Sequence, residues 1–173
     1  EENDVKNWSD FIAYQPNVHI QYVSPLKNYL IVKLRRMGED FIQVIPVDNE
    51  TGDYQLDKSY EIEVDSSIKN VGYYGLGIYN LEEILYTLNT MDTPASTIKI
   101  NLKTKEQTVM RVKPVPNYDA SLYGTERIYA VSHDNKKVPI SLIDRKDKFN
   151  QDGSNPLYLY GYGSYGYNVD PDF

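Results

Sequence analysis

The residues best suited to chemistry lie in a glycine-rich run near the end of the sequence, Tyr160–Gly166. The preceding run, Pro156–Tyr160, lacks polar alternation and therefore predicts a strand buried on both faces, as in α/β sheets. Tyr162 stands between two glycines at the carboxyl end of that strand, where α/β folds place their active sites. Its hydroxyl there can donate to a developing oxyanion. A packing role is the alternative, because the chain has 17 tyrosines.

Two other functions for the glycine-rich run fail on its own residues. Gly161, Gly163 and Gly166 match the GxGxxG spacing of dinucleotide sites, but that motif requires a following helix and an acid about 20 residues further on. The residues that follow form a poor helix start, and the sequence stops before an acid at that distance could appear. Ser164 is not a nucleophile elbow, since GxSxG requires glycine where this chain has Tyr162.

The remaining polar candidates are typical of surface and turn positions. His133 and Asp134 are adjacent in an expected hairpin loop, which favours turn formation over a catalytic triad. His19, at the start of an expected strand, is interpreted as a packing or surface residue. With no cysteine and only two histidines, the sequence excludes disulfides, thiolate zinc sites, imidazole clusters and a cysteine nucleophile. We therefore expect no metal and no cofactor.

Composition narrows the class of protein further. The 173 residues are 40% hydrophobic and 25% charged, as in globular proteins, and no run approaches the roughly 20 apolar residues of a membrane span. The formal net charge of -7 disfavours binding to nucleic acid or anionic lipid. The acidic start does not resemble a signal peptide, and the absence of cysteine fits a reducing compartment. A cytoplasmic location is the resulting expectation.

Short period-two runs rich in tyrosine and β-branched residues predict a mainly β fold. Four strands are expected in a first cycle, at Val18–Val23, Tyr29–Leu34, Phe41–Val47 and Tyr54–Asp65. Four more are expected in a second cycle, at Val71 with Tyr73–Tyr79, Ile84–Thr90, Thr97–Leu102 and Thr108–Lys113. The cycles, at about 18–65 and 71–113, have the length of four-stranded propeller blades.

One segment of the second cycle is ambiguous. Leu81, Ile84, Leu85 and Leu88 fall at helical spacing, and Asn80 is suited to an N-cap. The run around Tyr86 to Thr90 and the need for a fourth strand in the cycle favour a strand instead.

A domain boundary is expected at Pro114–Asn117, because proline donates no ladder hydrogen bond. After it, Arg127–Ser132 and Lys137–Ile143 flank His133–Lys136, a four-residue loop suited to a hairpin. A hairpin and one doubly buried strand cannot cover their own apolar faces. We therefore expect the chain to be a fragment that ends early in a second domain.

Several of these segments together resemble the prolyl oligopeptidase family of serine peptidases, and within it the oligopeptidase B branch. The segments that carry the resemblance are Glu126–Ala130, Lys137–Leu142, Arg145–Asp147, Asn155–Leu157 and Leu159–Gly166. Resemblance is strong over residues 123–173 and weak but collinear back to Trp8. It implies that residues 1–116 are the last two blades of a seven-bladed β-propeller. Residues 117–173 would then start a truncated α/β-hydrolase domain.

The resemblance also implies a function. The intact enzyme would hydrolyse short peptides after Arg or Lys, with Tyr162 as the oxyanion-hole donor. The family's serine, aspartate and histidine lie beyond Phe173, so the chain alone is expected to be inactive. Asp144 and Asn135 depart from the residues usual in the family, both at expected surface positions.

Two alternatives to this function stay open. One is a fragment of a post-proline oligopeptidase. The other is a non-catalytic propeller module that binds a peptide or glycan. Two isolated blades also leave exposed strand edges, so self-association is a further expectation.

Overall fold

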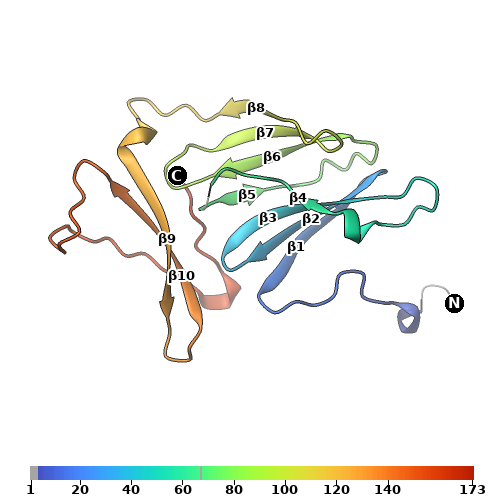
Figure 1. Ribbon diagram of the computed structural model, residues 1–173, viewed down its shortest axis with the longest axis horizontal. Coiled ribbons are helices and arrows are strands. Elements are labelled where there is room, and N and C mark those ends of the chain that lie inside the picture. Colours follow the sequence, from blue (N-terminus) through green and yellow to red (C-terminus); the bar gives the residue numbers. More distant parts are fainter. Residues whose placement is uncertain (1–3, 67) are drawn as a thin grey trace.

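The computed structural model describes residues 4–66 and 68–173, which form two four-stranded antiparallel sheets and one two-stranded sheet (Figure 1). The first sheet contains, in order, β1 (Val18–Pro25), β2 (Tyr29–Arg36), β3 (Glu39–Pro46) and β4 (Tyr60–Glu61). The second contains β5 (Asn70–Gly72), β6 (Glu83–Asn89), β7 (Ser96–Asn101) and β8 (Gln107–Val112). The two-stranded sheet is the hairpin of β9 (Tyr123–Val131) and β10 (Lys137–Arg145). Short 3₁₀ helices lie at η1 (Val5–Asn7), η2 (Leu56–Lys58), η3 (Ala120–Leu122) and η4 (Ser164–Gly166).

The β2–β3 hairpin is the centre of the first sheet. Its two-residue turn, Met37–Gly38, has positive φ at both positions, as the type I′ turn that matches strand twist requires. The turn fixes the register, so that Arg35 lies opposite Asp40 across the hairpin. The run Leu30–Val32 is buried on both faces of the sheet, which explains why it lacks polar alternation.

The main core lies between the two four-stranded sheets. Each sheet contributes one face of aliphatic side chains, and the largest fully buried members are Ile31, Ile42, Val44, Val71, Ile100 and Leu102. A second, smaller cluster on the opposite face of the first sheet contains Leu30, Val32, Leu34 and Ile45. The stacked sheets therefore bury a continuous core, as propeller blades do.

The ambiguous segment of the second cycle is a strand, as predicted. β6 pairs with β5 on one side and with β7 on the other. Ile84 and Tyr86 are buried on the core face, while Leu85 between them is 42% exposed. A strand satisfies this alternation together with both hydrogen-bonded ladders, and a helix would satisfy neither. At the outer edge of the same sheet, every residue of β8 is exposed.

The predicted fourth strand of the first cycle is much shorter than expected. Instead of a strand over Tyr54–Asp65, the chain makes one bridge at Tyr54, the helix η2, and the two-residue strand β4. The turn before it is responsible, because the Asp48 carboxylate accepts from two backbone N–H groups and from Gln55 Nε2. These bonds hold the chain in a loop until Tyr60 reaches β3.

The predicted strand at Tyr73–Tyr79 is wrong, since only β5 just before it pairs with β6. The polar groups of this segment bond to the first sheet instead. Tyr73 donates its hydroxyl to Ser24 Oγ, and the carbonyl of Tyr79 accepts from the N–H of Lys27. The segment therefore links the two sheets rather than extending the second one.

The predicted hairpin after residue 117 is confirmed, but the predicted strand at Pro156–Tyr160 is wrong. Asn135 lies in the hairpin loop with a φ of 61°, a conformation that asparagine tolerates better than most residues. Leu157, Tyr158 and Leu159 are 81%, 88% and 78% exposed. A doubly buried strand needs neighbours on both edges, and no strand of residues 4–66 or 68–173 pairs with this segment.

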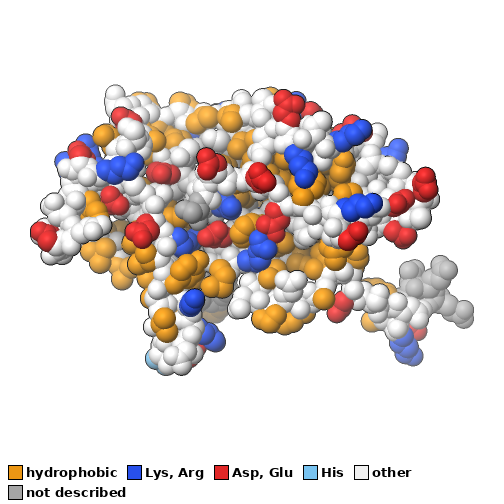
Figure 2. Space-filling view, viewed as in Figure 1, with side chains coloured by type: hydrophobic (Ala, Val, Ile, Leu, Met, Phe, Trp, Pro, Cys, Tyr) orange, Lys and Arg blue, Asp and Glu red, His pale blue; other side chains and the backbone are white. Residues whose placement is uncertain are grey.

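Acidic and basic side chains are interspersed over the face of the molecule in Figure 2, and hydrophobic ones gather along its lower side. In residues 4–66 and 68–173, no helix has the length and apolar character of a membrane span.

Candidate functional site

Tyr162, the predicted oxyanion donor, lies on an extended stretch just before η4. Its side chain is 53% exposed, and its ring packs edge-on against Tyr167, with 5.6 Å between the ring centroids. Among the described residues, none of the hydrogen bonds uses the Tyr162 hydroxyl. The phenol is therefore oriented by a ring contact, while its O–H remains available to an external acceptor.

The backbone after Tyr162 makes a sharp turn. Tyr165 and Gly166 both have positive φ, 57° and 71°, and the Tyr165 side chain is fully exposed. The N–H of Tyr167 donates to the carbonyl of Ser164, which closes the turn. This turn brings Tyr167 back against the Tyr162 ring.

The segment that carries Tyr162, residues 156–169, is held by polar contacts at both of its ends. Before it, Asn155 accepts from the N–H of Asn150 and donates to the carbonyl of Lys148. After it, Asp170 pairs with Arg35 of β2. Between these fastenings, the hydrogen bonds of the described residues join the segment only to itself.

The end of the segment also binds the second sheet. Asp172 accepts hydrogen bonds of 2.9 Å from Asn70 and 2.8 Å from Asn89, at the ends of β5 and β6. The Phe173 ring meets Tyr118 edge-on, with 4.7 Å between centroids. The chain after Tyr162 thus contacts both four-stranded sheets.

An ion cluster at the end of the first sheet receives Asp170. Asp40, 1% exposed, accepts from Arg35 Nε at 2.7 Å, and Lys33 Nζ lies 3.1 Å from its other oxygen. Arg35 Nη2 extends to Asp170 Oδ1, also at 2.7 Å. Burial lowers the pKa of Arg35, but hydrogen bonds to the two carboxylates outweigh it and raise the pKa above its usual value. Arg35 is therefore a fixed cation with two bound carboxylates.

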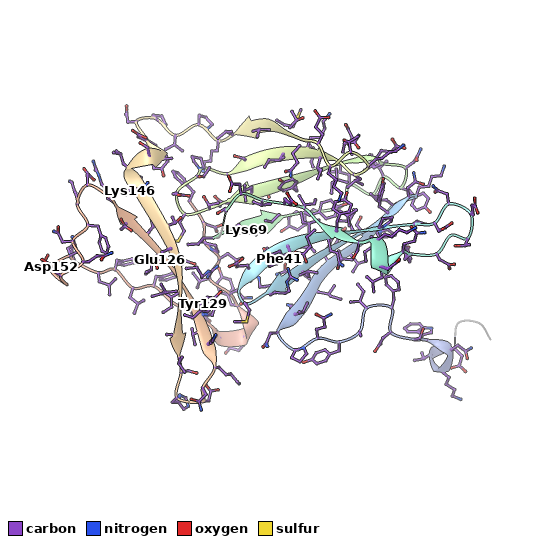
Figure 3. The ribbon with its side chains drawn as sticks, in the orientation of Figure 1. Phe41, Lys69, Glu126, Tyr129, Lys146 and Asp152 are labelled. Carbon is purple, nitrogen blue, oxygen red and sulfur yellow. The ribbon has the colours of Figure 1, made fainter. Side chains whose placement is uncertain are left out.

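The β9–β10 hairpin docks on the same turn of the first sheet. An added Cβ at Gly38 would lie 2.9 Å from Pro139 Cγ, so the hairpin approaches the turn closely. Beside it, Arg127 Nε lies 3.8 Å from Glu39 Oε1. Lys69 Nζ lies 4.9 Å from the centroid of the Phe41 ring on β3, and both residues are labelled in Figure 3. The end of the first sheet at the β2–β3 turn thus contacts both the β9–β10 hairpin and, through Arg35, Asp170 of the segment that follows Tyr162.

The other polar residues singled out in the sequence do not form a site. His133 and Asp134 lie exposed in the β9–β10 loop, where Asp134 accepts from Ser132 Oγ and pairs with Lys136. His19 lies exposed on β1. Near the β2–β3 turn, Glu61 of β4 is half-exposed and pairs with Arg36 at 2.8 Å, so its carboxylate is already engaged. In the part of the chain that the structure describes, no three acidic or imidazole side chains are grouped so as to hold a metal ion.

The cluster of Lys33, Arg35 and Asp40 was not predicted from the sequence. The signal was present in part, because a two-residue turn at Met37–Gly38 places Arg35 opposite Asp40. No local pattern indicated that Asp170 joins them.

Comparison with known proteins finds a family match over most of the chain. The family model described as the prolyl oligopeptidase N-terminal β-propeller domain matches residues 1–113. The chain is 34% identical to "Dipeptidyl aminopeptidase BI" of Pseudoxanthomonas mexicana over 97% of its own length and 22% of that protein's. It is 30% identical to "Protease 2" of Moraxella lacunata over 99% of its length and 24% of that protein's. The chain spans about a quarter of the length of these relatives.

Solved structures show the same arrangement of strands. Oligopeptidase B from Trypanosoma brucei, in a closed form with covalently bound antipain, superposes with a TM-score of 0.84 at 23% identity. That match covers 94% of this chain and 23% of the other. Oligopeptidase B from Leishmania major superposes with a TM-score of 0.78 at 28% identity, over 91% of this chain and 22% of the other.

Proposed function

The chain belongs to the prolyl oligopeptidase family, and from that premise we propose that it is the part of a serine oligopeptidase where propeller and peptidase domain meet. Its two four-stranded sheets would be the last two of seven blades, at about 18–65 and 71–113 within residues 1–116. Residues 117–173 would begin the α/β-hydrolase domain. The family match that ends at residue 113 and the separate β9–β10 hairpin after it support this division.

The proposed activity is hydrolysis of short peptides, with Tyr162 as a donor to the oxyanion. One observation carries this role: the Tyr162 hydroxyl is unbonded among the described residues, while Tyr167 orients its ring. A hydroxyl fixed in place before reaction stabilises the charge of the tetrahedral intermediate without reorganisation. A serine nucleophile, its histidine base and its aspartate would come from residues outside these 173, so we expect no activity from this chain alone. The cytoplasmic location expected from the sequence stays a prediction.

Tyr162→Phe in the full-length protein tests the role, because it removes only the hydroxyl. We expect kcat to fall about 100-fold or more with KM nearly unchanged, as for other single oxyanion donors. Tyr165→Phe is the matched control, since that tyrosine lies in the same turn and is fully exposed. An unchanged kcat in Tyr162→Phe would eliminate the oxyanion role, and equal losses in both variants would indicate a general disturbance of the turn.

We propose cleavage after Arg or Lys, in line with the resemblance to oligopeptidase B and with the 28% identity to the Leishmania enzyme. Peptides that differ only in Arg, Lys or Pro before the scissile bond test this specificity. A preference for Pro would support the post-proline alternative. No cleavage of any of these peptides, together with binding of intact peptide or glycan, would support the non-catalytic propeller module.

A second candidate activity is release of dipeptides from the amino terminus, favoured by the 34% identity to the protein named dipeptidyl aminopeptidase BI. The two activities differ in their need for a free α-amino group. Matched substrates with free and acetylated amino termini distinguish them. Cleavage of the acetylated peptide would contradict dipeptide release, and cleavage of the free peptide alone would contradict internal cleavage.

A further inference from the structure

The cluster at the end of the first sheet has a feature that the stability of the sheet does not require. Asp40 already has two cationic partners within the hairpin, Lys33 and Arg35. The contact of Arg35 Nε with Asp40 is enough to pair the two strands of the hairpin. Arg35 nevertheless uses its Nη2 to bind Asp170, in the segment that follows Tyr162.

The fork of Arg35 makes this second contact directional. A guanidinium is planar, and its donors have fixed relative directions. With Nε held on buried Asp40, the direction of Nη2 is set by the first sheet. The 2.7 Å contact therefore fixes the location of Asp170 relative to β2 and β3. Arg35 is only 11% exposed, so water screens the pair less than it screens a surface ion pair.

A short path leads from Asp170 to Tyr162. Tyr167, three residues before Asp170, packs edge-on on the Tyr162 ring. Pro171, directly after Asp170, is buried, and Asp172 is held by two asparagines of the second sheet. The residues after Asp170 are thus held against the second sheet, and Tyr167, just before Asp170, contributes the ring that orients Tyr162.

We propose that Asp170 and Arg35 are positioning residues that set the placement of the Tyr162 hydroxyl through Tyr167. This inference rests on the proposed oxyanion role of Tyr162. The propeller blade would then contribute to catalysis without touching substrate, by holding the donor in the geometry that the oxyanion needs. A displacement of about 1 Å in such a group can reduce the rate 100-fold.

Asp170→Asn in the full-length protein is the primary test. Asp170 is 30% exposed, so the isosteric change should leave the fold intact, whereas Arg35→Gln would leave Asp40 buried with one cation fewer. We expect kcat to fall about tenfold or more with KM nearly unchanged, and Asp170→Glu to recover part of the loss.

The matched control is Asp147→Asn, which breaks the Arg145 pair. That pair has the same 2.7 Å nitrogen–oxygen distance as Arg35 and Asp170, but it is made through Nε and lies exposed where β10 ends. It should leave kcat unchanged. Equal kcat values for wild type and Asp170→Asn would overturn the proposal, and so would an equal loss in Asp147→Asn.

The double variant Asp170→Asn with Tyr162→Phe separates action through Tyr162 from a general structural effect. If Asp170 acts by placing the Tyr162 hydroxyl, its replacement should reduce kcat no further once that hydroxyl is gone. A full tenfold additional loss in the Tyr162→Phe background would overturn the proposal while leaving the oxyanion role intact. An unchanged kcat in Tyr162→Phe alone would instead remove the oxyanion role, and this inference with it.

Discussion

Asp40→Asn is expected to destabilise this chain by about 3 kcal/mol, because it removes the buried carboxylate that pairs with both Arg35 and Lys33. Asp40 is 1% exposed, with Arg35 Nε at 2.7 Å and Lys33 Nζ at 3.1 Å. Asparagine keeps the size and one acceptor, but its NH₂ group places a donor where the carboxylate has an acceptor.

The magnitude follows from what each cation keeps. Breaking a buried ion pair by removing one partner costs about 3–5 kcal/mol. Arg35 retains Asp170, and Lys33 is 14% exposed and can turn toward water, so the low end of that range applies. With an m-value of about 2 kcal/mol/M in urea, the unfolding midpoint should fall by about 1.5 M.

Equilibrium urea unfolding of the 173-residue chain, followed by far-ultraviolet circular dichroism, measures this shift. The control is Glu83→Gln, which breaks a 3.0 Å pair with Lys99 whose partners are 46% and 37% exposed. Such exposed pairs contribute about 1 kcal/mol or less. If the two variants lowered the midpoint equally, burial would add nothing to the Asp40 pair and the reasoning would be refuted.

Two further predictions concern Gly38 in the β2–β3 turn and Tyr60, which hydrogen-bonds from the first sheet to Leu102 after β7. Gly38→Ala should destabilise the chain by about 1–3 kcal/mol and by more than Gly52→Ala. Both glycines have a φ of 80°, but only at Gly38 would the added Cβ also clash with Pro139. Equal urea midpoints for the two variants would show that the β9–β10 hairpin moves away from the added Cβ at no cost. Tyr60 donates to the carbonyl of Leu102, and burial raises its pKa to about 12, above the unfolded value near 10. Its contribution to stability is therefore complete below pH 10 and lost as the pH rises from 10 to 12. Tyr60→Phe should make the fall in stability over that range shallower, and an identical slope in both proteins would contradict the assignment.

Most of the sheet architecture was predictable from local sequence. Period-two runs located the central strands of both four-stranded sheets, and turn residues located the hairpins. The failures share a cause. Tyr73–Tyr79 and Pro156–Tyr160 both have strand composition, but a strand exists only where a neighbour accepts its hydrogen bonds. The partners of Tyr73–Tyr79 are in the other sheet, and no described strand pairs with Pro156–Tyr160.

Of the candidate site, the sequence predicted the identity of Tyr162 but not its surroundings. Two flanking glycines and the preceding apolar run distinguished Tyr162 from the other tyrosines, and the resemblance to a peptidase family gave it a role. The exposure of Tyr162 and its contact with Tyr167 required coordinates, because the left-handed conformation of Tyr165 that brings the two rings together has no clear signature in the sequence.

The sequence by itself determined the central strands of both four-stranded sheets and the turns that join them, because each depends on residues within a few positions of one another. The register that places Arg35 opposite Asp40 was seen only in the structure. Only the tertiary structure decided that Asp170 completes the cluster, and that the β9–β10 hairpin rests on the same turn. These contacts join residues far apart in the chain, so they depend on how finished elements pack and not on any local pattern.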